Sequence, residues 1–218
     1  MSTKTARALQ GPSLTEIILG IFLSVLIGAA LAALWLINKP VDIVRELPKE
    51  PVAGKVYYVE GSNISTKGRQ WLRKRQLFVE GTSVTLIEDE LNAAVASLAP
   101  TGDKKEEAAG MVQPGTLNFR IADGRLQIGT PVQVNVAGFQ SKMQVSVSGD
   151  FERAGDKFVF VPRKFYVGSC PIERLPVLPG MILDRLFAGV TFPEDLIEGW
   201  GRLAAVTIEG PQLQLTMP

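Results

Sequence analysis

The sequence predicts an α+β protein with one N-terminal transmembrane helix, followed by one domain in which an antiparallel sheet packs on amphipathic helices. Three observations lead to this fold class. Residues 17–37 form an uninterrupted apolar run, residues 117–167 alternate between apolar and polar side chains, and apolar residues recur at helical spacing on either side of that segment. The chain then divides into an N-terminal tail at 1–13, a transmembrane anchor at 14–37, a linker at 38–51 and an α+β domain at 52–218.

The apolar run from Ile17 to Ile37 has the length and composition of a membrane-spanning helix. It covers 21 residues without a charge, close to what a helix needs to cross a hydrocarbon core of ~30 Å. In that core every backbone N–H and C=O must be hydrogen-bonded within the segment, so a helix is expected. A cleaved signal peptide, suggested by Ala30-Leu31-Ala32, and a buried core helix are the alternatives. The run continues past this cleavage pattern and exceeds the ~7–15 apolar residues of a signal peptide, so we favour an anchor.

Basic residues flank the anchor almost equally. Lys4 and Arg7 precede it, and Lys39, Arg45 and Lys49 follow it, so the positive-inside rule gives nearly a tie. We favour a cytoplasmic N-terminal tail, because a short tail before the first apolar segment resembles a signal-anchor. The expected location is then the cell's inner (plasma) membrane, crossed once, with the C-terminal domain outside the cytoplasm and periplasmic in a Gram-negative cell.

Small residues recur every four positions along the anchor, at Gly20, Ser24, Gly28 and Ala32. This spacing places them on one helix face, where a second helix can approach closely. Small residues are also common in membrane helices without such pairing, and that is the alternative interpretation. The pattern predicts a helix-pairing face and, through it, other membrane proteins as partners.

The composition excludes several classes of function. From Asn38 onward the chain holds 21 Lys and Arg and 21 Asp and Glu, so no long-range field draws the domain to nucleic acid. The chain has no histidine, which excludes Ser-His-Asp and Cys-His nucleophilic sites and histidine-ligated metals. Its single cysteine, Cys170, excludes an internal disulfide and is expected to be a small packed residue. We expect no enzymatic activity, no cofactor, no metal and no nucleic-acid partner.

The region between the linker and the alternating segment carries both strand and helix signals. Trp71 and Phe78 lie seven residues apart, as on one stripe of a helix, although residues 76–79 could also form a strand. Thr85 and Glu88 have the spacing of a capping box. The expected elements are a strand over 52–60, a helix around 71–79, a strand over 83–86, a helix over 87–98 and a polar loop over 99–116.

The segment over 117–167 predicts a meander of antiparallel strands with one apolar face. Turns are expected at residues 122–125 and 154–156, where glycine and aspartate interrupt the alternation. The opposite face is expected to meet water and carries Asn118, Arg120, Arg125, Gln127, Gln133, Asn135, Gln144 and Ser146.

Prolines mark the remaining boundaries. Those at 40, 48 and 51 oppose regular structure in the linker. Pro179 can open a helix, and Thr191 and Glu194 around Pro193 indicate a second helix that ends near Leu203. The chain then closes with two expected strands, 205–209 and 212–217.

Three weak motifs resemble one family of envelope proteins. They are Leu86-x-x-x-Glu90-Leu91-Asn92 at a strand-to-helix junction, the turn at residues 123–126, and the ending at residues 209–215. Together with the N-terminal anchor and the meander, they make the chain similar to membrane-anchored YpmS-type and LmeA-like proteins and, more distantly, to tubular lipid-binding (TULIP-like) proteins. The resemblance covers most of residues 80–218, and none of its motifs is catalytic.

The resemblance implies a highly curved sheet wrapped around a long helix, enclosing an apolar groove for lipid acyl chains. A membrane-anchored, non-catalytic, lipid-binding or lipid-transfer-like domain is therefore expected, with membrane lipid as its partner. The same side chains at the same spacing also describe an ordinary filled core. The residues expected to line the groove are Phe119, Phe139, Met143, Phe158, Phe160, Phe165, Met181, Leu186 and Phe187.

A basic segment around Trp71 is a second candidate site. Near an anionic leaflet each basic side chain contributes about 1 kcal/mol, and a tryptophan can lie at the headgroup level. We expect this segment to dock the domain on the membrane or to bind lipid phosphates, unless it is a solvated helix face paired with nearby acids. Its residues are Lys67, Arg69, Trp71, Arg73, Lys74 and Arg75.

Glu88, Asp89 and Glu90 form an acidic cluster at a predicted helix start. Paired carboxylates can perform acid–base chemistry or bind calcium, but here the helix dipole and capping explain them.

A different class of function also fits the chain as a whole. It could be a structural or assembly subunit of a membrane complex that uses the small-residue face of the anchor and its sheet edges as contacts.

Overall fold

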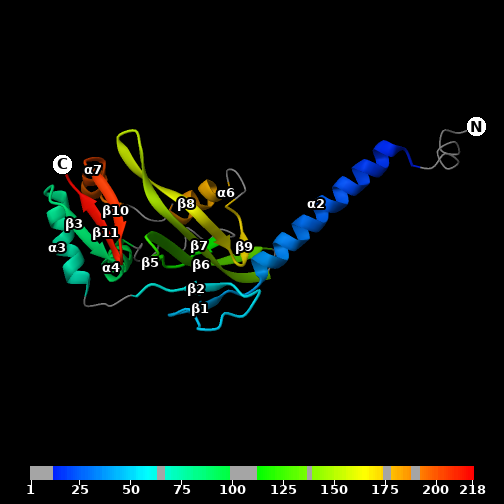
Figure 1. The fold of residues 1–218 in the computed structure, drawn as a ribbon, viewed down its shortest axis with the longest axis horizontal. Coiled ribbons are helices and arrows are strands. Elements are labelled where there is room, and N and C mark those ends of the chain that lie inside the picture. Colours follow the sequence, from blue (N-terminus) through cyan, green and yellow to red (C-terminus); the bar gives the residue numbers. More distant parts are fainter. Residues whose placement is uncertain (1–11, 63–66, 99–111, 137–138, 174–177, 188–191) are drawn as a thin grey trace, which may run out of the picture.

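A computed structural model of the chain describes residues 12–62, 67–98, 112–136, 139–173, 178–187 and 192–218 (Figure 1). An N-terminal apolar helix is followed by antiparallel sheets and helices, and the strands within these ranges form no closed barrel. The predicted α+β fold class is confirmed. Most of the predicted loop over 99–116 lies outside the described residues, and its end forms strand β4, Val112–Pro114.

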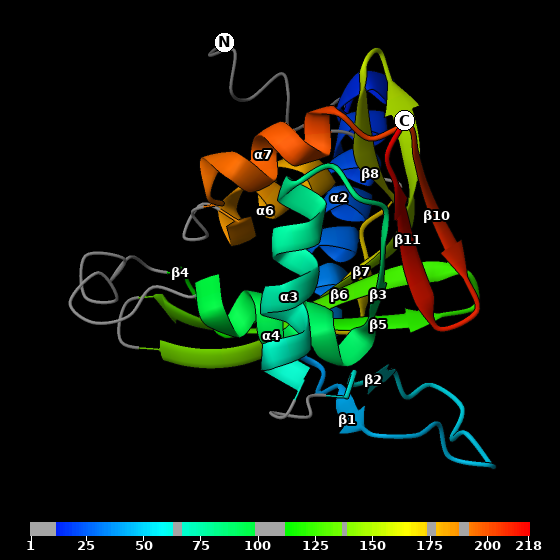
Figure 2. The ribbon, with the colours of Figure 1, turned by 90° about the vertical axis from the view of Figure 1, so that its left-hand side faces the viewer.

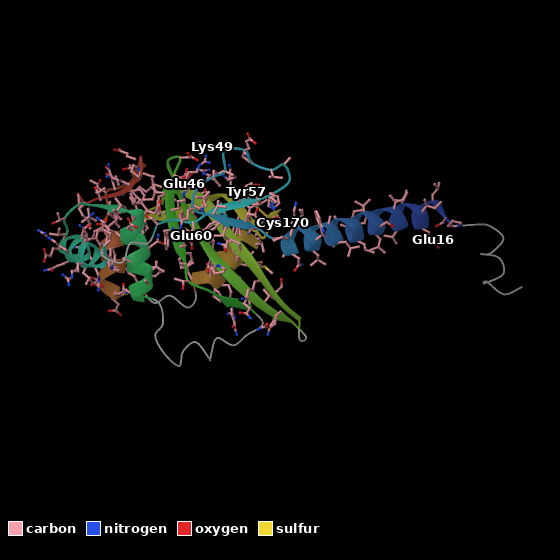
Figure 3. The ribbon with its side chains drawn as sticks, turned by 90° about the horizontal axis from the view of Figure 1, so that it is seen from below. Glu16, Glu46, Lys49, Tyr57, Glu60 and Cys170 are labelled. Carbon is pink, nitrogen blue, oxygen red and sulfur yellow. The ribbon has the colours of Figure 1, made fainter. Side chains whose placement is uncertain are left out.

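Helix α2, Leu14–Asn38, projects away from the rest of the molecule (Figure 1). Its start is a capping box, in which the Ser13 Oγ accepts from the Glu16 N–H and the Glu16 carboxylate accepts from the Ser13 N–H. None of its residues is buried, and in Figure 3 its side chains radiate into open space from Glu16 to the domain. The helix is long and apolar enough to cross a membrane.

The last turn of α2 is part of the folded domain. The Leu36 carbonyl accepts from the Ser169 N–H at 3.0 Å, and Ser141 and Asn38 are hydrogen-bonded through their side chains at 3.1 Å. Gly168 has a φ of +59°, and a Cβ there would lie 2.1 Å from the Ile37 carbonyl oxygen. The helix and the sheet therefore meet without a flexible joint at this position.

The linker contains a strand that the sequence did not predict. Strand β1, Asp42–Val44, pairs in parallel with β2, Tyr57–Val59, which lies within the predicted strand over 52–60. The prolines exclude regular structure only at their own positions and immediate neighbours, and residues 42–44 lie between them. Figures 1 and 3 show this ribbon lying across the large sheet.

The predicted meander is a six-stranded antiparallel sheet in the order β4-β6-β7-β8-β9, with β5 paired to β6. A tight turn at Asp123-Gly124, both with positive φ, joins β5 to β6. The turn predicted at 154–156 joins β7 to β8, and a register shift at Ser148/Gly149 bends β7 against β8. The strands are β5 (Asn118–Ala122), β6 (Arg125–Val136), β7 (Phe139–Ala154), β8 (Lys157–Val167) and β9 (Cys170–Pro171).

The expectation that the polar face of this sheet meets water is wrong for part of it. The Tyr58 ring lies over Gly129, where a Cβ would be 2.1 Å from the tyrosine oxygen, and its hydroxyl donates to the Asn118 Oδ1 at 3.0 Å. Gln127 donates to the Val59 carbonyl at 2.9 Å, and Gln144 is buried. The β1–β2 ribbon covers Asn118 and Gln127 through these contacts, which a period-two pattern within one strand cannot reveal.

The remaining elements other than α6 form a second layer at the end of the domain opposite α2, and α6 lies nearer to α2 (Figure 1). In Figure 2, which views that end directly, α3, α7 and the β10–β11 pair lie in front of α2. The predicted helices and strands of this region are observed, and the alternative strand over 76–79 is wrong because these residues continue a helix. The elements are α3 (Gly68–Val79), β3 (Val84–Ile87), α4 (Glu88–Leu98), α6 (Leu178–Phe187), α7 (Glu194–Gly201), β10 (Ala205–Glu209) and β11 (Gln212–Thr216). The last three strands pair antiparallel in the order β10-β11-β3.

Candidate ligand pocket

An apolar pocket of about 570 Å³ lies between the large sheet, the small sheet and the helices of the second layer. This volume falls within the ~300–1,000 Å³ of ligand sites in proteins. Three of its lining residues are charged, namely Lys74, Lys157 and Asp184, and the other 20 are apolar. The apolar lining includes Trp71, Phe78, Val84, Leu86, Leu91, Ala94, Val95, Phe119, Leu126, Ile128, Phe151, Phe160, Leu183, Phe187, Phe192, Leu196, Ile197, Trp200, Leu213 and Leu215.

Helix α3 supplies one wall of the pocket through a single face. Trp71, Lys74 and Phe78 lie three and four residues apart, so their side chains share one side of the helix. Two contacts fix α3 against α7. Arg75 binds Asp195 through its Nη2 at 2.8 and 3.2 Å, and Arg202 donates to the Val79 carbonyl at 2.8 Å.

Helix α7 closes the pocket on another side. Its Trp200 donates from Nε1 to the Phe158 carbonyl at 2.8 Å, which ties the helix to β8, and its ring lies 5.6 Å from that of Phe151. Gly199 permits a close approach to α3, since a Cβ there would lie 2.6 Å from the Phe78 Cε1. The aromatic walls are thus held by specific contacts between elements distant in sequence.

An ion pair between Lys74 and Glu90 lies behind the apolar wall. Glu90 is fully buried, and its Oε2 accepts from the Lys74 ammonium at 2.7 Å and from the Ile87 N–H at 3.0 Å. Lys74 also donates to the Thr85 carbonyl at 2.6 Å. The bond from Glu90 to the backbone three residues earlier is that of the glutamate in a capping box. Ile87 has no side-chain oxygen, so only the glutamate half of a box is present here. The box predicted at Thr85 and Glu88 is wrong, because the Glu88 carboxylate binds the Ser62 and Ile121 N–H groups instead.

The rest of the acidic cluster binds backbone and hydroxyl groups of other segments. Glu88 accepts from the Ser62 N–H at 2.7 Å and from the Ile121 N–H at 3.0 Å, and Asp89 accepts from the Ser62 hydroxyl at 2.8 Å. Asn92 completes this junction with two donated bonds, to the Ser62 and Phe119 carbonyls, and one accepted from the Phe119 N–H. These side chains fix α4 against β5, and among the described residues no acidic group is clustered for a metal.

The structure distributes the predicted groove residues over several environments. Phe119, Phe160 and Phe187 line the pocket. Phe165 and Leu186 are buried in the core outside it, and Met143 and Phe158 are partly buried against that core. Met181 is 60% exposed on the outside of α6. The side chain of Phe139 lies outside the described residues.

The structure also divides the predicted membrane-contact residues. Trp71 is buried in the pocket wall rather than placed at a surface, and Lys74 and Arg75 are ion-paired with Glu90 and Asp195. Arg69 and Arg73 are exposed and Lys67 is half-buried. All six lie on or beside α3, at the end of the domain away from α2 (Figure 1). Contact of this basic segment with a membrane stays a prediction.

The structure also places the small residues of the anchor and the single cysteine. Gly20, Ser24, Gly28 and Ala32 lie along α2 and are exposed, with the Ser24 hydroxyl donating to the Gly20 carbonyl at 2.8 Å. Cys170 is buried and free, in β9 (Figure 3).

Sequence reasoning missed the lining residues of α7 and β11. Leu196 and Trp200 lie four residues apart, and Leu213 and Leu215 lie two apart, so both pairs were recognisable as buried faces. Their shared pocket depends on how α7 and the small sheet pack, which the periodicity of each segment does not contain.

No protein-family model matches this chain, and no curated protein or solved structure matches it either. The site must therefore be interpreted from its own geometry.

Proposed function

We propose that this protein is a membrane-anchored, non-catalytic domain that binds lipid in the apolar pocket. The observation that carries the proposal is the pocket itself, about 570 Å³ of space with 20 apolar lining residues. Filling such a space with an acyl chain removes apolar surface from water on both sides, which is favourable by about 25 cal/mol per Å². A filled core, the alternative considered from the sequence, leaves no such space.

Helix α2 is the anchor in this proposal, with the N-terminus in the cytoplasm and the domain outside it at the plasma membrane. Support comes from the length and apolar composition of α2, none of whose residues is buried. The resemblance to YpmS-type and TULIP-like envelope proteins, which the sequence suggested, agrees with this arrangement. Because the last turn of α2 is joined to the sheet, α3 and α7, which line the pocket, are held at the end of the domain away from α2 (Figures 1 and 2).

The absence of catalysis is also part of the proposal. Glu88 and Glu90 are engaged by backbone N–H groups or by an ammonium. Such contacts hold the helix in place and leave these carboxylates no role in proton transfer to a ligand.

Tryptophan fluorescence offers a direct test, because two of the three tryptophans line the pocket. Trp71 and Trp200 lie in its walls, and Trp35 lies on α2. In a Trp35→Phe variant of the full chain in nanodiscs, the remaining emission reports on the pocket alone. Bromine quenches tryptophan on contact, so a fatty acid brominated along its chain should quench this emission in a saturable manner.

Ala94 and Ala96 provide a matched control on α4. Ala94 is buried in the pocket wall, and Ala96 is exposed on the same helix. Ala94→Phe should abolish the saturable quenching and Ala96→Phe should preserve it. Absence of saturable quenching in the Trp35→Phe background, or equal quenching in both alanine variants, would contradict lipid binding in the pocket.

An assembly subunit of a membrane complex is the second candidate, supported by the exposed small-residue face of α2. Gly20 and Gly28 have open space where a Cβ would stand, so a second helix could approach there. The two candidate functions predict different molecules bound to the purified protein. A lipid-binding domain keeps lipid in its pocket after purification, whereas an assembly subunit is purified empty together with another membrane protein.

A further inference from the structure

The pocket is large enough for one acyl chain and too small for two. A methylene group occupies on the order of 30 Å³, about the volume of a water molecule in the liquid. The observed 570 Å³ therefore accommodates roughly 19 methylene groups when completely filled. Two chains of a common membrane phospholipid contain well over this number.

The charged residues of the lining indicate where a polar headgroup can lie. The Lys74 ammonium is already bound by the Glu90 carboxylate and the Thr85 carbonyl, so the wall behind it offers a headgroup no uncompensated charge. Lys157 and Asp184 are exposed, and within the described residues neither forms an ion pair. A headgroup therefore finds water and unpaired charges only at these two residues.

Two apolar residues of the lining are also exposed. Phe192 and Ile197 line the pocket and are 44% and 55% exposed, so they stand where the pocket meets solvent. Together with Lys157 and Asp184 they are the four exposed residues of the lining, and we call these four residues the rim. A chain can enter past the apolar side chains while its polar end stays beside the charged ones.

We propose that the ligand is a single-chain amphiphile, such as a fatty acid or a lysophospholipid, with its chain in the pocket and its head at this rim. The inference rests on the proposed lipid-binding function and names its ligand class. A two-chain phospholipid would leave its second chain in water, at a loss of about fourfold in affinity for each exposed methylene. One chain per domain follows from the volume.

Photo-crosslinking in a bilayer tests the ligand class on the full chain. The probes are a fatty acid and a lysophosphatidylcholine, each with a diazirine in its one chain, and a phosphatidylcholine with the same diazirine in one of two chains. Each is added to the full chain in phosphatidylcholine nanodiscs, and labelled peptides are mapped by mass spectrometry. Labelling of α2 reports bilayer lipid, and labelling of α4 and α7 reports the pocket.

Both single-chain probes should label α4 and α7, and the two-chain probe should label α2 alone. In Ala94→Phe a phenyl ring takes roughly 150 Å³ of the pocket, about the cavity that holds one benzene. This loss of space should abolish labelling of α4 and α7 by a chain long enough to fill the pocket, and Ala96→Phe should leave the labelling unchanged. Labelling of α4 and α7 by the two-chain probe as strongly as by the others would overturn the single-chain inference but keep lipid binding. No labelling of these helices by any probe would overturn both.

Discussion

Removing either partner of the buried Lys74–Glu90 ion pair should destabilise the fold. The exposures of the two side chains predict which loss costs more. Glu90 is fully buried and keeps one further bond, from the Ile87 N–H, if the ammonium is removed. Its Oε1 has no partner among the described residues. Lys74→Met therefore leaves a nearly isolated carboxylate in the protein interior. We expect it to lower the free energy of unfolding by about 3–5 kcal/mol, the usual result of removing one partner from a buried pair.

Removing the charge of Glu90 instead should lower the free energy of unfolding by less. The Lys74 side chain is 32% exposed and can turn toward water, whereas the Glu90 side chain is 1% exposed. Glu90→Gln keeps an acceptor for the Ile87 N–H and removes one charge-assisted bond, a loss of about 1.5–3 kcal/mol. In the double variant Lys74→Met/Glu90→Leu both charges are absent beside an apolar wall. That variant should be less destabilised than Lys74→Met alone.

Urea unfolding of the full chain in nanodiscs, followed by tryptophan fluorescence, measures these differences. Arg69→Met is the matched control, because Arg69 is exposed on the same helix and should change stability by less than about 0.5 kcal/mol. If Glu90→Gln proved as destabilising as Lys74→Met, or if Lys74→Met/Glu90→Leu proved no more stable than Lys74→Met alone, the pair would not be coupled through burial.

Two further predictions concern stability away from this pair. Burial raises the pKa of Tyr58 to about 12, so the unfolded chain loses the phenol proton before the folded chain does. The free energy of unfolding should therefore fall between pH 10 and pH 12 by up to about 2–3 kcal/mol, and Tyr58→Phe should remove this part of the pH dependence. Gly199→Ala forces a Cβ against the Phe78 ring and should cost about 1–3 kcal/mol by thermal unfolding. Gly201→Ala, on the same helix with open space around it, should be neutral or stabilise by up to about 1 kcal/mol.

Local periodicity was sufficient to predict the elements whose buried face can be recognised within one segment of the chain. The apolar run gave α2, the period-two alternation gave the meander, and the spacing of Leu91, Ala94 and Val95 gave α4. Strand β1 was missed because its partner is β2, 13 or more residues further along the chain. No feature of residues 42–44 themselves records that partner.

The sequence predicted an apolar groove, but it did not predict most of the residues that line the pocket. The large side chains along the sheet suggested a groove, and three of them line the pocket. Phe165 lies in the solid core, with 0% of its surface exposed. Trp71 was expected at a membrane surface because of its basic neighbours, yet its side of α3 turns inward with Phe78. Which face of a helix is covered depends on the elements that pack against it, and for α3 those include α4, α7 and β3.

Lipid occupancy of the purified full chain tests the central claim most directly. Native mass spectrometry would count lipid retained by the wild-type chain, Ala94→Phe and Ala96→Phe after release from a bulky detergent. Lipid held around α2 is common to all three, so the difference between the two variants counts lipid in the pocket. We expect one lipid per chain in the wild type and in Ala96→Phe that is missing in Ala94→Phe. Equal lipid counts in the two variants, in chains that remain folded, would show that the pocket holds no lipid.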